Sequence, residues 1–345
     1  MLKRNSQCET RSRNLENSAS SIRRSSYAQY YTQKTRKPTV LSYSSKRMTT
    51  SIAEAILQGA HKLRKAGVPE ARREAGSLLT HVIARDRSFI ISHAEDPLSA
   101  EELEKFGETL EWRAKGKPLQ YITGHQEFFG LDFEVTPDVL IPRPETELLV
   151  EAALKLAPNS KAFICDVGTG SGCIVVTLLR ELPRARGLAI DVSGAAIEVA
   201  KRNASRHSVS DRLEFLASDC FAEVNRKGAL FDMVVSNPPY VSVGELESLQ
   251  REVRDYEPHL ALEAGADGLS IIRRLLVDAG VFLKTGGHFL FEIGFDQHAT
   301  VEQLVDPTVW KLLDIYRDMQ GIPRTVVLEK LNPGRPPAFP ECHIG

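Results

Sequence analysis

The chain reads Ala162-Phe163-Ile164-Cys165-Asp166-Val167-Gly168-Thr169-Gly170-Ser171-Gly172 near its middle, an apolar run of strand type followed at once by a glycine-rich turn. Apolar residues then recur at helical spacing, so the turn joins a strand to a helix. Gly168 and Gly170 allow a tight turn and let a ligand approach the backbone, and Gly172 lets the helix pack on the strand. The spacing is Gly-x-Gly-x-Gly, not the Gly-x-Gly-x-x-Gly of dinucleotide-binding proteins, and no Lys-Ser/Thr follows it, which excludes a P-loop.

Apolar runs and helical stretches alternate from residue 161 onward. We expect seven strands, at residues 162–165, 187–190, 213–216, 231–235, 288–293, 310–316 and 325–328. Helical stretches such as 195–206 and 269–277 separate the earlier ones. This alternation predicts an α/β fold with an open, mostly parallel sheet covered by helices on both faces. The last two strands are expected to form a terminal antiparallel pair.

Two carboxylates follow the second and third of these strands. Asp191 ends the second strand, nineteen residues beyond Gly172, where a carboxylate can accept both hydroxyls of a ribose. Asp219 follows the third strand and is placed to accept from an adenine amine, with Cys220 and Phe221 beside the ring. Together with the glycine loop, the two acids indicate an adenosine-type ligand. The alternative is that both acids only cap helices.

The tetrapeptide Asn237-Pro238-Pro239-Tyr240 directly follows the fourth apolar run. Its prolines carry no N–H, so the hydrogen-bond ladder of the preceding strand does not continue through them. The carbonyls of Asn237 and Pro238 are therefore not engaged in that ladder. The Asn237 side chain adds a further acceptor, and Tyr240 adds a flat apolar wall. Such a turn suits a planar –NH2 group, an amide or an exocyclic amine. An ordinary Pro-Pro turn is the alternative, and the glycine loop upstream favours the functional interpretation.

These features favour S-adenosylmethionine over a nicotinamide cofactor. The glycine spacing is wrong for a dinucleotide, and no hydride-relay His or Tyr-x-x-x-Lys stands nearby. The Asn-Pro-Pro-Tyr follows the fourth strand, and the late pair of strands suits the reversed hairpin of methyltransferases.

The region before residue 144 divides into segments of different character. Residues 51–124 show helical spacing, with a capping box formed by Ser99 and Glu102, and predict a small helical bundle. Residues 127–141 alternate loosely around Gly130 and suggest a β-hairpin, and residues 142–147 open a helix. The expected organisation is a presequence at 1–50, the bundle at 51–124, a hairpin linker at 125–143, a catalytic domain at 144–332 and a tail at 333–345.

The net charge of −1 hides an asymmetry. Residues 1–50 hold eleven of the 44 Lys and Arg but only two of the 45 Asp and Glu, which leaves 33 basic and 43 acidic residues in the remainder. An Arg- and Ser-rich, acid-poor N-terminus is typical of a mitochondrial transit peptide. The alternatives are a disordered basic tail for nucleic acid, or an internal start at Met48 that gives a cytosolic form.

Cysteine usage and hydropathy further narrow the class of protein to which the chain could belong. The five cysteines are scattered, without the spacing of metal ligands or of a disulfide framework, so no metal site is expected and a reducing compartment is indicated. No apolar stretch approaches the roughly 20 residues that span a bilayer, so no membrane partner is expected.

Taken together, these motifs resemble those of the HemK-type family, protein N5-glutamine methyltransferases that modify peptide-chain release factors. The resemblance covers about residues 51–330. Besides the glycine loop and the Asn-Pro-Pro-Tyr it includes Gly-Lys-Pro-Leu-Gln-Tyr-Ile-Thr-Gly at 116–124, Ile-Pro-Arg-Pro-Glu-Thr-Glu at 141–147, Tyr-Glu-Pro at 256–258, Asp-Gly-Leu at 267–269, Phe-Glu-Ile-Gly at 291–294, and Asp318 with Gly321 and Arg324. Two positions depart from the pattern: Cys220 stands where relatives often have a bulky apolar residue, and Pro323 interrupts the last motif.

The resemblance implies a Rossmann-like, S-adenosylmethionine-dependent methyltransferase with a seven-stranded sheet behind a helical bundle. The implied cofactor site consists of Gly168, Thr169, Gly170, Ser171, Gly172, Asp191, Asp219, Cys220 and Asn237. Asn237, Pro238 and Tyr240 would be catalytic, and together with Pro239 they would bind the glutamine of a Gly-Gly-Gln loop. The implied partner is a class I release factor, part of which would bind the helical bundle. The expected location is the mitochondrial matrix, or the cytoplasm for a form that begins at the internal start Met48.

Two other functions stay open at this point. An N6-adenine or N2-guanine methyltransferase would use the same turn for a base flipped out of its stack. Enzymes that act on nucleic acid usually present a basic face. The excess of acidic over basic residues in 51–345 therefore disfavours direct nucleic-acid binding. A catalytically inactive adaptor protein is the other alternative, and the intact glycine, acid and Asn-Pro-Pro-Tyr elements disfavour it.

Overall fold

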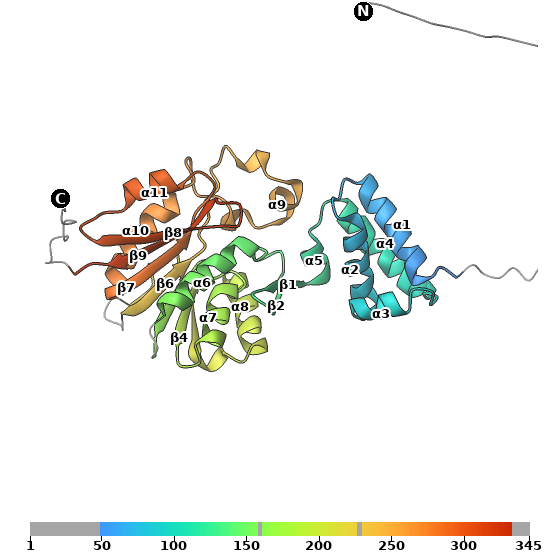
Figure 1. The fold of residues 1–345 in the computed structure, drawn as a ribbon, viewed down its shortest axis with the longest axis horizontal. Helices are drawn as coiled ribbons and strands as arrows, with labels where there is room; N and C mark the ends of the chain where they lie inside the picture. Colours follow the sequence, from blue (N-terminus) through green and yellow to red (C-terminus); the bar gives the residue numbers. More distant parts are fainter. Residues whose placement is uncertain (1–48, 158–160, 226–229, 333–345) are drawn as a thin grey trace, which may run out of the picture. The chain divides into compact units, whose positions relative to one another are not determined.

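A computed structural model of the chain describes residues 49–157, 161–225 and 230–332 (Figure 1). The expected presequence, apart from Thr49 and Thr50, and the expected tail at 333–345 lie outside the described residues.

The predicted helical bundle precedes the sheet. Its members are α1 (Ile52–Lys65), α2 (Ala71–Ile83), α3 (Arg87–Ser92), α4 (Ala100–Ala114) and α5 (Leu119–Thr123). Capping boxes start the two longest of these helices, at Ser51 and at Ser99. The bundle buries apolar residues in a core of its own. α3 and α5 were not predicted, because five or six residues are too few to show helical spacing. Within the described residues, no helix is long and apolar enough to cross a bilayer.

A short β-hairpin, β1 (His125–Phe128) and β2 (Leu131–Glu134), follows the bundle. Phe129 and Gly130 turn the chain with φ angles of 52° and 71°, and two positive angles in succession are what a type I′ hairpin requires. The sequence suggested pairing as far as residue 141, but the ladder ends at Glu134. Pro137 lacks the N–H that a longer ladder would need.

The expected catalytic domain is built on one seven-stranded sheet. The strands are β3 (Phe163–Val167), β4 (Arg186–Asp191), β5 (Leu213–Ala217), β6 (Phe231–Ser236), β7 (Leu283–Glu292), β8 (Trp310–Arg317) and β9 (Pro323–Lys330). Their order is β5-β4-β3-β6-β7-β9-β8. The first five in this order pair in parallel, and β9 pairs antiparallel with both β7 and β8. The predicted parallel sheet with a terminal antiparallel pair is confirmed.

Helices cover both faces of this sheet (Figure 1). They are α6 (Glu147–Leu156), α7 (Cys173–Glu181), α8 (Gly194–Arg206), α10 (Ser270–Phe282) and α11 (His298–Leu304), with single turns η1 (Pro144–Thr146), η2 (Ser210–Arg212), η3 (Leu246–Ser248) and η4 (His259–Ala261) between elements. Successive strand residues point to opposite faces. Ile164 therefore joins the core under α6 and α7, whereas Cys165 joins the core under α10. The two cores bury most residues of the central strands β3 and β6, which explains why these strands read as continuous apolar runs.

A buried arginine joins the bundle to α9 (Arg251–Tyr256), a helix between β6 and α10. The Arg113 side chain of α4 is 3% exposed and pairs with Glu74 of α2 and, at 2.6 Å, with Glu252 of α9. The Tyr256 hydroxyl also donates to the Lys115 carbonyl at 3.3 Å. These contacts fix α9 to the end of the bundle.

Replacing Arg113 by Ala is expected to lower the free energy of unfolding by about 3–5 kcal/mol, because Glu74 would keep a largely buried charge without its partner. Urea denaturation measures this value. The matched control is Arg202→Ala, whose partner Glu134 lies in an exposed ion pair, and whose loss should cost no more than about 1 kcal/mol. Equal, small losses in the two variants would contradict the prediction.

Candidate active site

A cavity of about 370 Å³ lies where β3, β4, β5 and β6 end, a volume typical of small-molecule sites. Ten of the predicted site residues line it: Gly168, Thr169, Gly170, Ser171, Asp191, Asp219, Cys220, Asn237, Pro238 and Pro239. Gly172 and Tyr240 do not. The sheet thus brings together four chain segments that are far apart in sequence, as expected for the carboxyl edge of parallel strands.

The glycine loop has the geometry that its sequence predicts, with one correction. Gly168 and Gly170 have φ angles of 73° and 53°, and a Cβ at either would meet no atom within 4 Å. Both therefore leave open space for a ligand. Gly172 was expected to pack helix against strand, but its neighbour is another helix: an added Cβ would lie 3.2 Å from Cβ of Ala200 in α8.

Asp191 holds the glycine loop in place. One of its oxygens accepts from the Gly170 amide at 2.8 Å and the other from the Ser193 amide at 2.9 Å. Burial raises the pKa of this carboxyl. The helix-capping alternative is excluded here, because Ser193 caps α8 with its own hydroxyl. Each oxygen of Asp191 keeps a lone pair for a ligand hydroxyl.

The region around Asp219 differs in detail from the prediction. The Asp219 side chain is 61% exposed and pairs with Arg274 of α10 at 2.7 Å. Cys220 lines the cavity, whereas Phe221, expected beside an adenine ring, packs against Phe282 with ring centroids 4.8 Å apart. The sequence did not single out Arg274, because nothing in it shows that α10 lies across from this loop.

The Asn-Pro-Pro-Tyr turn is anchored from behind by residues distant in sequence. The Gln297 amide donates to the Tyr240 carbonyl at 3.0 Å. A Cβ at Gly268 would lie 2.4 Å from that carbonyl oxygen, and a Cβ at Gly294 would lie 3.0 Å from the Tyr240 ring. These contacts explain the glycines of the Asp-Gly-Leu and Phe-Glu-Ile-Gly motifs. Only a residue without a side chain fits there.

Two further residues, Thr146 and Glu292, bond to the turn. The Asn237 amide nitrogen donates to the Thr146 hydroxyl at 3.0 Å, and that hydroxyl donates to Glu292 at 2.6 Å. The Tyr240 hydroxyl lies 3.4 Å from the other Glu292 oxygen. The sequence placed both residues in motifs but gave no role to either one.

Two carboxyls behind the cavity are buried. Asp166 accepts from the Thr169 hydroxyl at 2.7 Å through Oδ2, and Oδ1 has no partner among the described residues. Burial raises the pKa of Asp166 to about 7. Burial likewise raises the pKa of Glu292 to about 7. Both groups therefore favour the protonated form more than free carboxyls do.

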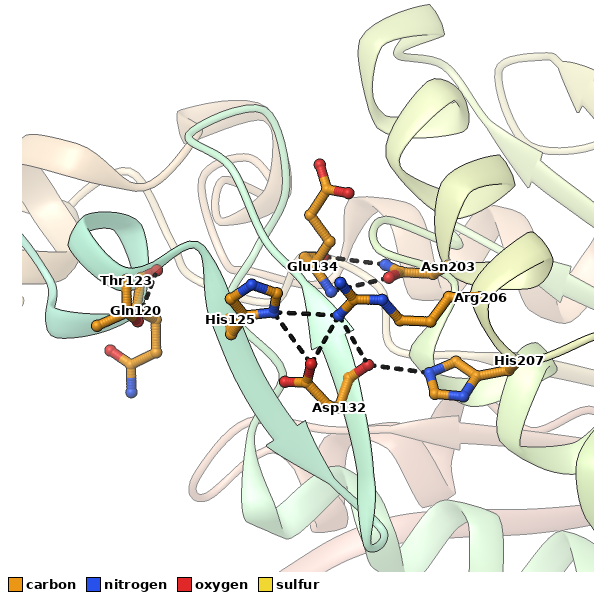
Figure 2. Close-up of polar contacts among 8 residues, drawn as sticks. All are labelled: Gln120, Thr123, His125, Asp132, Glu134, Asn203, Arg206 and His207. Atoms are coloured by element: carbon orange, nitrogen blue, oxygen red, sulfur yellow. Dashed lines mark hydrogen bonds and ion pairs between the residues drawn. The ribbon is translucent and has the colours of Figure 1, made fainter. Parts of the chain in front are cut away.

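Asn203 of α8 connects the glycine loop to the β-hairpin. Its fully buried amide nitrogen donates to the carbonyls of Ser171 and Glu134, each at 2.9 Å, and its oxygen accepts from the Glu134 amide at 2.8 Å. Figure 2 shows Arg206, the last residue of the same helix, and His207, which follows it, bonded to Asp132 of β2. The hairpin is thus fixed to the helix that lies beside the glycine loop.

In the ranges that the structure describes, no cluster of three or more His, Cys, Asp or Glu side chains could hold a metal ion.

Comparisons with known proteins place this geometry in context. A family model described as the PrmC N-terminal domain matches residues 54–124, and one described as the methyltransferase small domain matches residues 144–256. A release factor glutamine methyltransferase of Koribacter versatilis is 42% identical over 281 residues, which cover 81% of this chain and 99% of the relative. One of Cereibacter sphaeroides is also 42% identical, over 79% of this chain and 96% of that protein. Among solved structures, the hMettl16 catalytic domain in complex with the MAT2A 3'UTR hairpin 6 matches at a TM-score of 0.49 and 18% identity, over 64% of this chain and 82% of that one.

The buried Asp166 makes stability depend on pH. Folding raises its pKa from 3.8 to about 7, so the folded chain holds a proton that the unfolded chain releases in this window. Stability should therefore fall as pH rises from about 4 to about 7. Asp166→Asn should make this fall shallower, as measured by urea unfolding across the range. Parallel curves for the variant and the wild type would contradict the prediction.

Proposed function

This chain belongs to the release factor glutamine methyltransferase family, and we propose that it transfers a methyl group from S-adenosylmethionine to a glutamine side-chain nitrogen of a class I release factor. The names of its relatives and the Asn-Pro-Pro-Tyr turn beside the cavity support this function. The observation that carries it is the orientation of Asn237: its nitrogen is bonded to Thr146, which leaves its oxygen as an acceptor.

The cavity residues fit the cofactor. Gly168 and Gly170 have positive φ angles and leave room beside the backbone, and Asp191 retains lone pairs for two ribose hydroxyls. Val192 and Ile271 add apolar lining. S-adenosylmethionine would supply an electrophilic methyl group on a sulfonium.

The turn would orient a weak nucleophile. The lone pair of an amide nitrogen is delocalised into its carbonyl, so position and charge stabilisation decide the rate. No described residue donates to the Pro238 carbonyl or to the Asn237 side-chain oxygen, so both are available to the two hydrogens of a substrate –NH2. These bonds would strengthen as positive charge develops on nitrogen, which lowers the barrier. No general base is needed before transfer, because the methylated amide loses its proton readily.

Walls on either side would complete the substrate site. Pro239 lines the cavity, and Tyr240 packs against Gly294 behind it. Burial raises the pKa of the Tyr240 hydroxyl, so it stays protonated and available as a donor to Glu292. A planar amide held by this turn would have its nitrogen directed toward the glycine loop, where the methyl donor is expected.

Asn237→Ala should lower kcat for glutamine methylation by roughly a hundredfold to a thousandfold, the usual cost of removing one group that stabilises transition-state charge. Most of its affinity for S-adenosylmethionine, measured by calorimetry, should remain, because the other residues of the implied cofactor site are unchanged. Near-normal turnover in this variant would contradict the proposed role of the turn.

The glutamine is proposed to lie in a Gly-Gly-Gln loop, since glycines without side chains let a narrow loop enter a cavity of this size. Incubation with labelled cofactor separates the remaining alternatives. Label on a class I release factor supports the proposal, label on DNA or RNA supports the amino-group nucleic-acid methyltransferase, and no label on either supports an inactive adaptor.

We also propose a mitochondrial location, on the composition of residues 1–50 alone. Removal of most of residues 1–47 would then leave a chain that starts near Ser51. Mass spectrometry of the N-terminus of protein purified from organelles should find this shortened chain. An intact Met1, or protein found only in the cytosol starting at Met48, would contradict the location and leave the reaction unaffected.

A further inference from the structure

A chain of hydrogen bonds runs from the core to the Asn-Pro-Pro-Tyr turn. Glu292, at the end of β7, is 1% exposed, and Thr146, in η1, is 2% exposed. The Thr146 hydroxyl lies 2.6 Å from Glu292 Oε2 and 3.0 Å from Asn237 Nδ2. Thr146 lies in η1, Asn237 directly follows β6 and Glu292 ends β7, so the sheet and η1 must both be in place for these hydrogen bonds to form.

The direction of this chain follows from the chemistry of its members. A hydroxyl has one proton, and an ionised carboxylate is only an acceptor. The Thr146 proton is therefore committed to Glu292, and its oxygen can only accept from Asn237. Asn237 must then turn its –NH2 toward Thr146, which leaves Oδ1 on the other side of the amide. The two ends of an asparagine amide have the same shape, so packing alone would not choose between them.

We propose that Thr146 and Glu292 are positioning residues that fix the Asn237 amide with its oxygen toward the substrate nitrogen. The inference rests on the proposed glutamine methylation, because an –NH2 acceptor is what that substrate needs. With the amide reversed, Asn237 would present its own –NH2 to the substrate –NH2, and no hydrogen bond could form between two donors.

The protonation of Glu292 controls the direction. A protonated carboxyl can donate to Thr146, which can then donate to Asn237 Oδ1 and reverse the chain. The other groups that act on Glu292 are Arg324 of β9, Glu145 of η1, Cys173 of α7 and the Tyr240 hydroxyl. Burial raises the pKa of Glu292 to about 7, so the reversal falls within an accessible range of pH.

Thr146→Val and Thr146→Ser form the matched pair that tests the inference with the full chain. Valine keeps the shape and removes the hydroxyl, so kcat should fall by about tenfold to a hundredfold, as expected for a misplaced catalytic group. Serine keeps the hydroxyl and should restore most of the rate. The dissociation constant for S-adenosylmethionine should stay similar in both. Equal rates in Thr146→Val and wild type, or equal losses in the two variants, would overturn the inference.

The orientation of the Asn237 side-chain amide can be tested directly by NMR, without substrate. Its –NH2 protons should exchange slowly with solvent in the wild type and in Thr146→Ser, and rapidly in Thr146→Val. Rapid exchange in the wild type would overturn the inference whatever the activity. If the wild-type protein shows slow exchange but methylates no release factor, the proposed function is wrong, and so is the inference that rests on it.

The pH dependence of kcat in the variant Glu292→Gln tests the part that the charge of Glu292 plays. In the wild type, kcat should fall as the pH drops below about 7, because protonation of Glu292 allows the reversed chain. The variant has no carboxyl to titrate, so this dependence should become shallower, at a lower overall rate, whereas Thr146→Ser should keep it. An unchanged pH dependence in Glu292→Gln would overturn the part assigned to its charge.

Discussion

Parallel pairing of β3 with β4 on one side and β6 on the other is the constraint on which the site depends. Val167 pairs with Ile190, and Asp166 with Val235, so three strands end side by side. The amides of Gly168 and Thr169 then bond to the Ile190 carbonyl. Because all three strands are parallel, the segments that follow them lie together at the carboxyl edge of the sheet. These segments are the glycine loop, Asp191 and the Asn-Pro-Pro-Tyr turn.

That edge also holds the groups that are costly to bury. Asp166 and Glu292 are almost wholly enclosed, and burying a polar group of this kind costs free energy that an apolar side chain would not. Each is instead bonded to a residue of the cavity wall: Asp166 to Thr169 and Glu292 to Thr146. The polar core thus serves the geometry of the site rather than stability, which is where exceptions to a uniformly apolar core are expected.

The sequence predicted what depends on local pattern and missed what depends on distant contacts. Continuous apolar runs were sufficient for the sheet. Of the twelve site residues that the motifs and the family resemblance indicated, ten line the cavity, and their roles stay predictions. Thr146 and Glu292 were not given roles, because they are 146 residues apart in the chain and only the sheet brings them together. Phe221 and Gly172 were assigned to the wrong neighbours for the same reason: a residue's position in a loop does not show which helix packs on it.

The central claim is that this edge presents acceptors to an amide –NH2 for methyl transfer. Tandem mass spectrometry of a class I release factor, treated with the enzyme and S-adenosylmethionine, tests it most directly. We predict one added methyl group, located on the side-chain nitrogen of the glutamine in the Gly-Gly-Gln loop. A methyl group on any other residue, or on an oxygen of that side chain, would contradict the account.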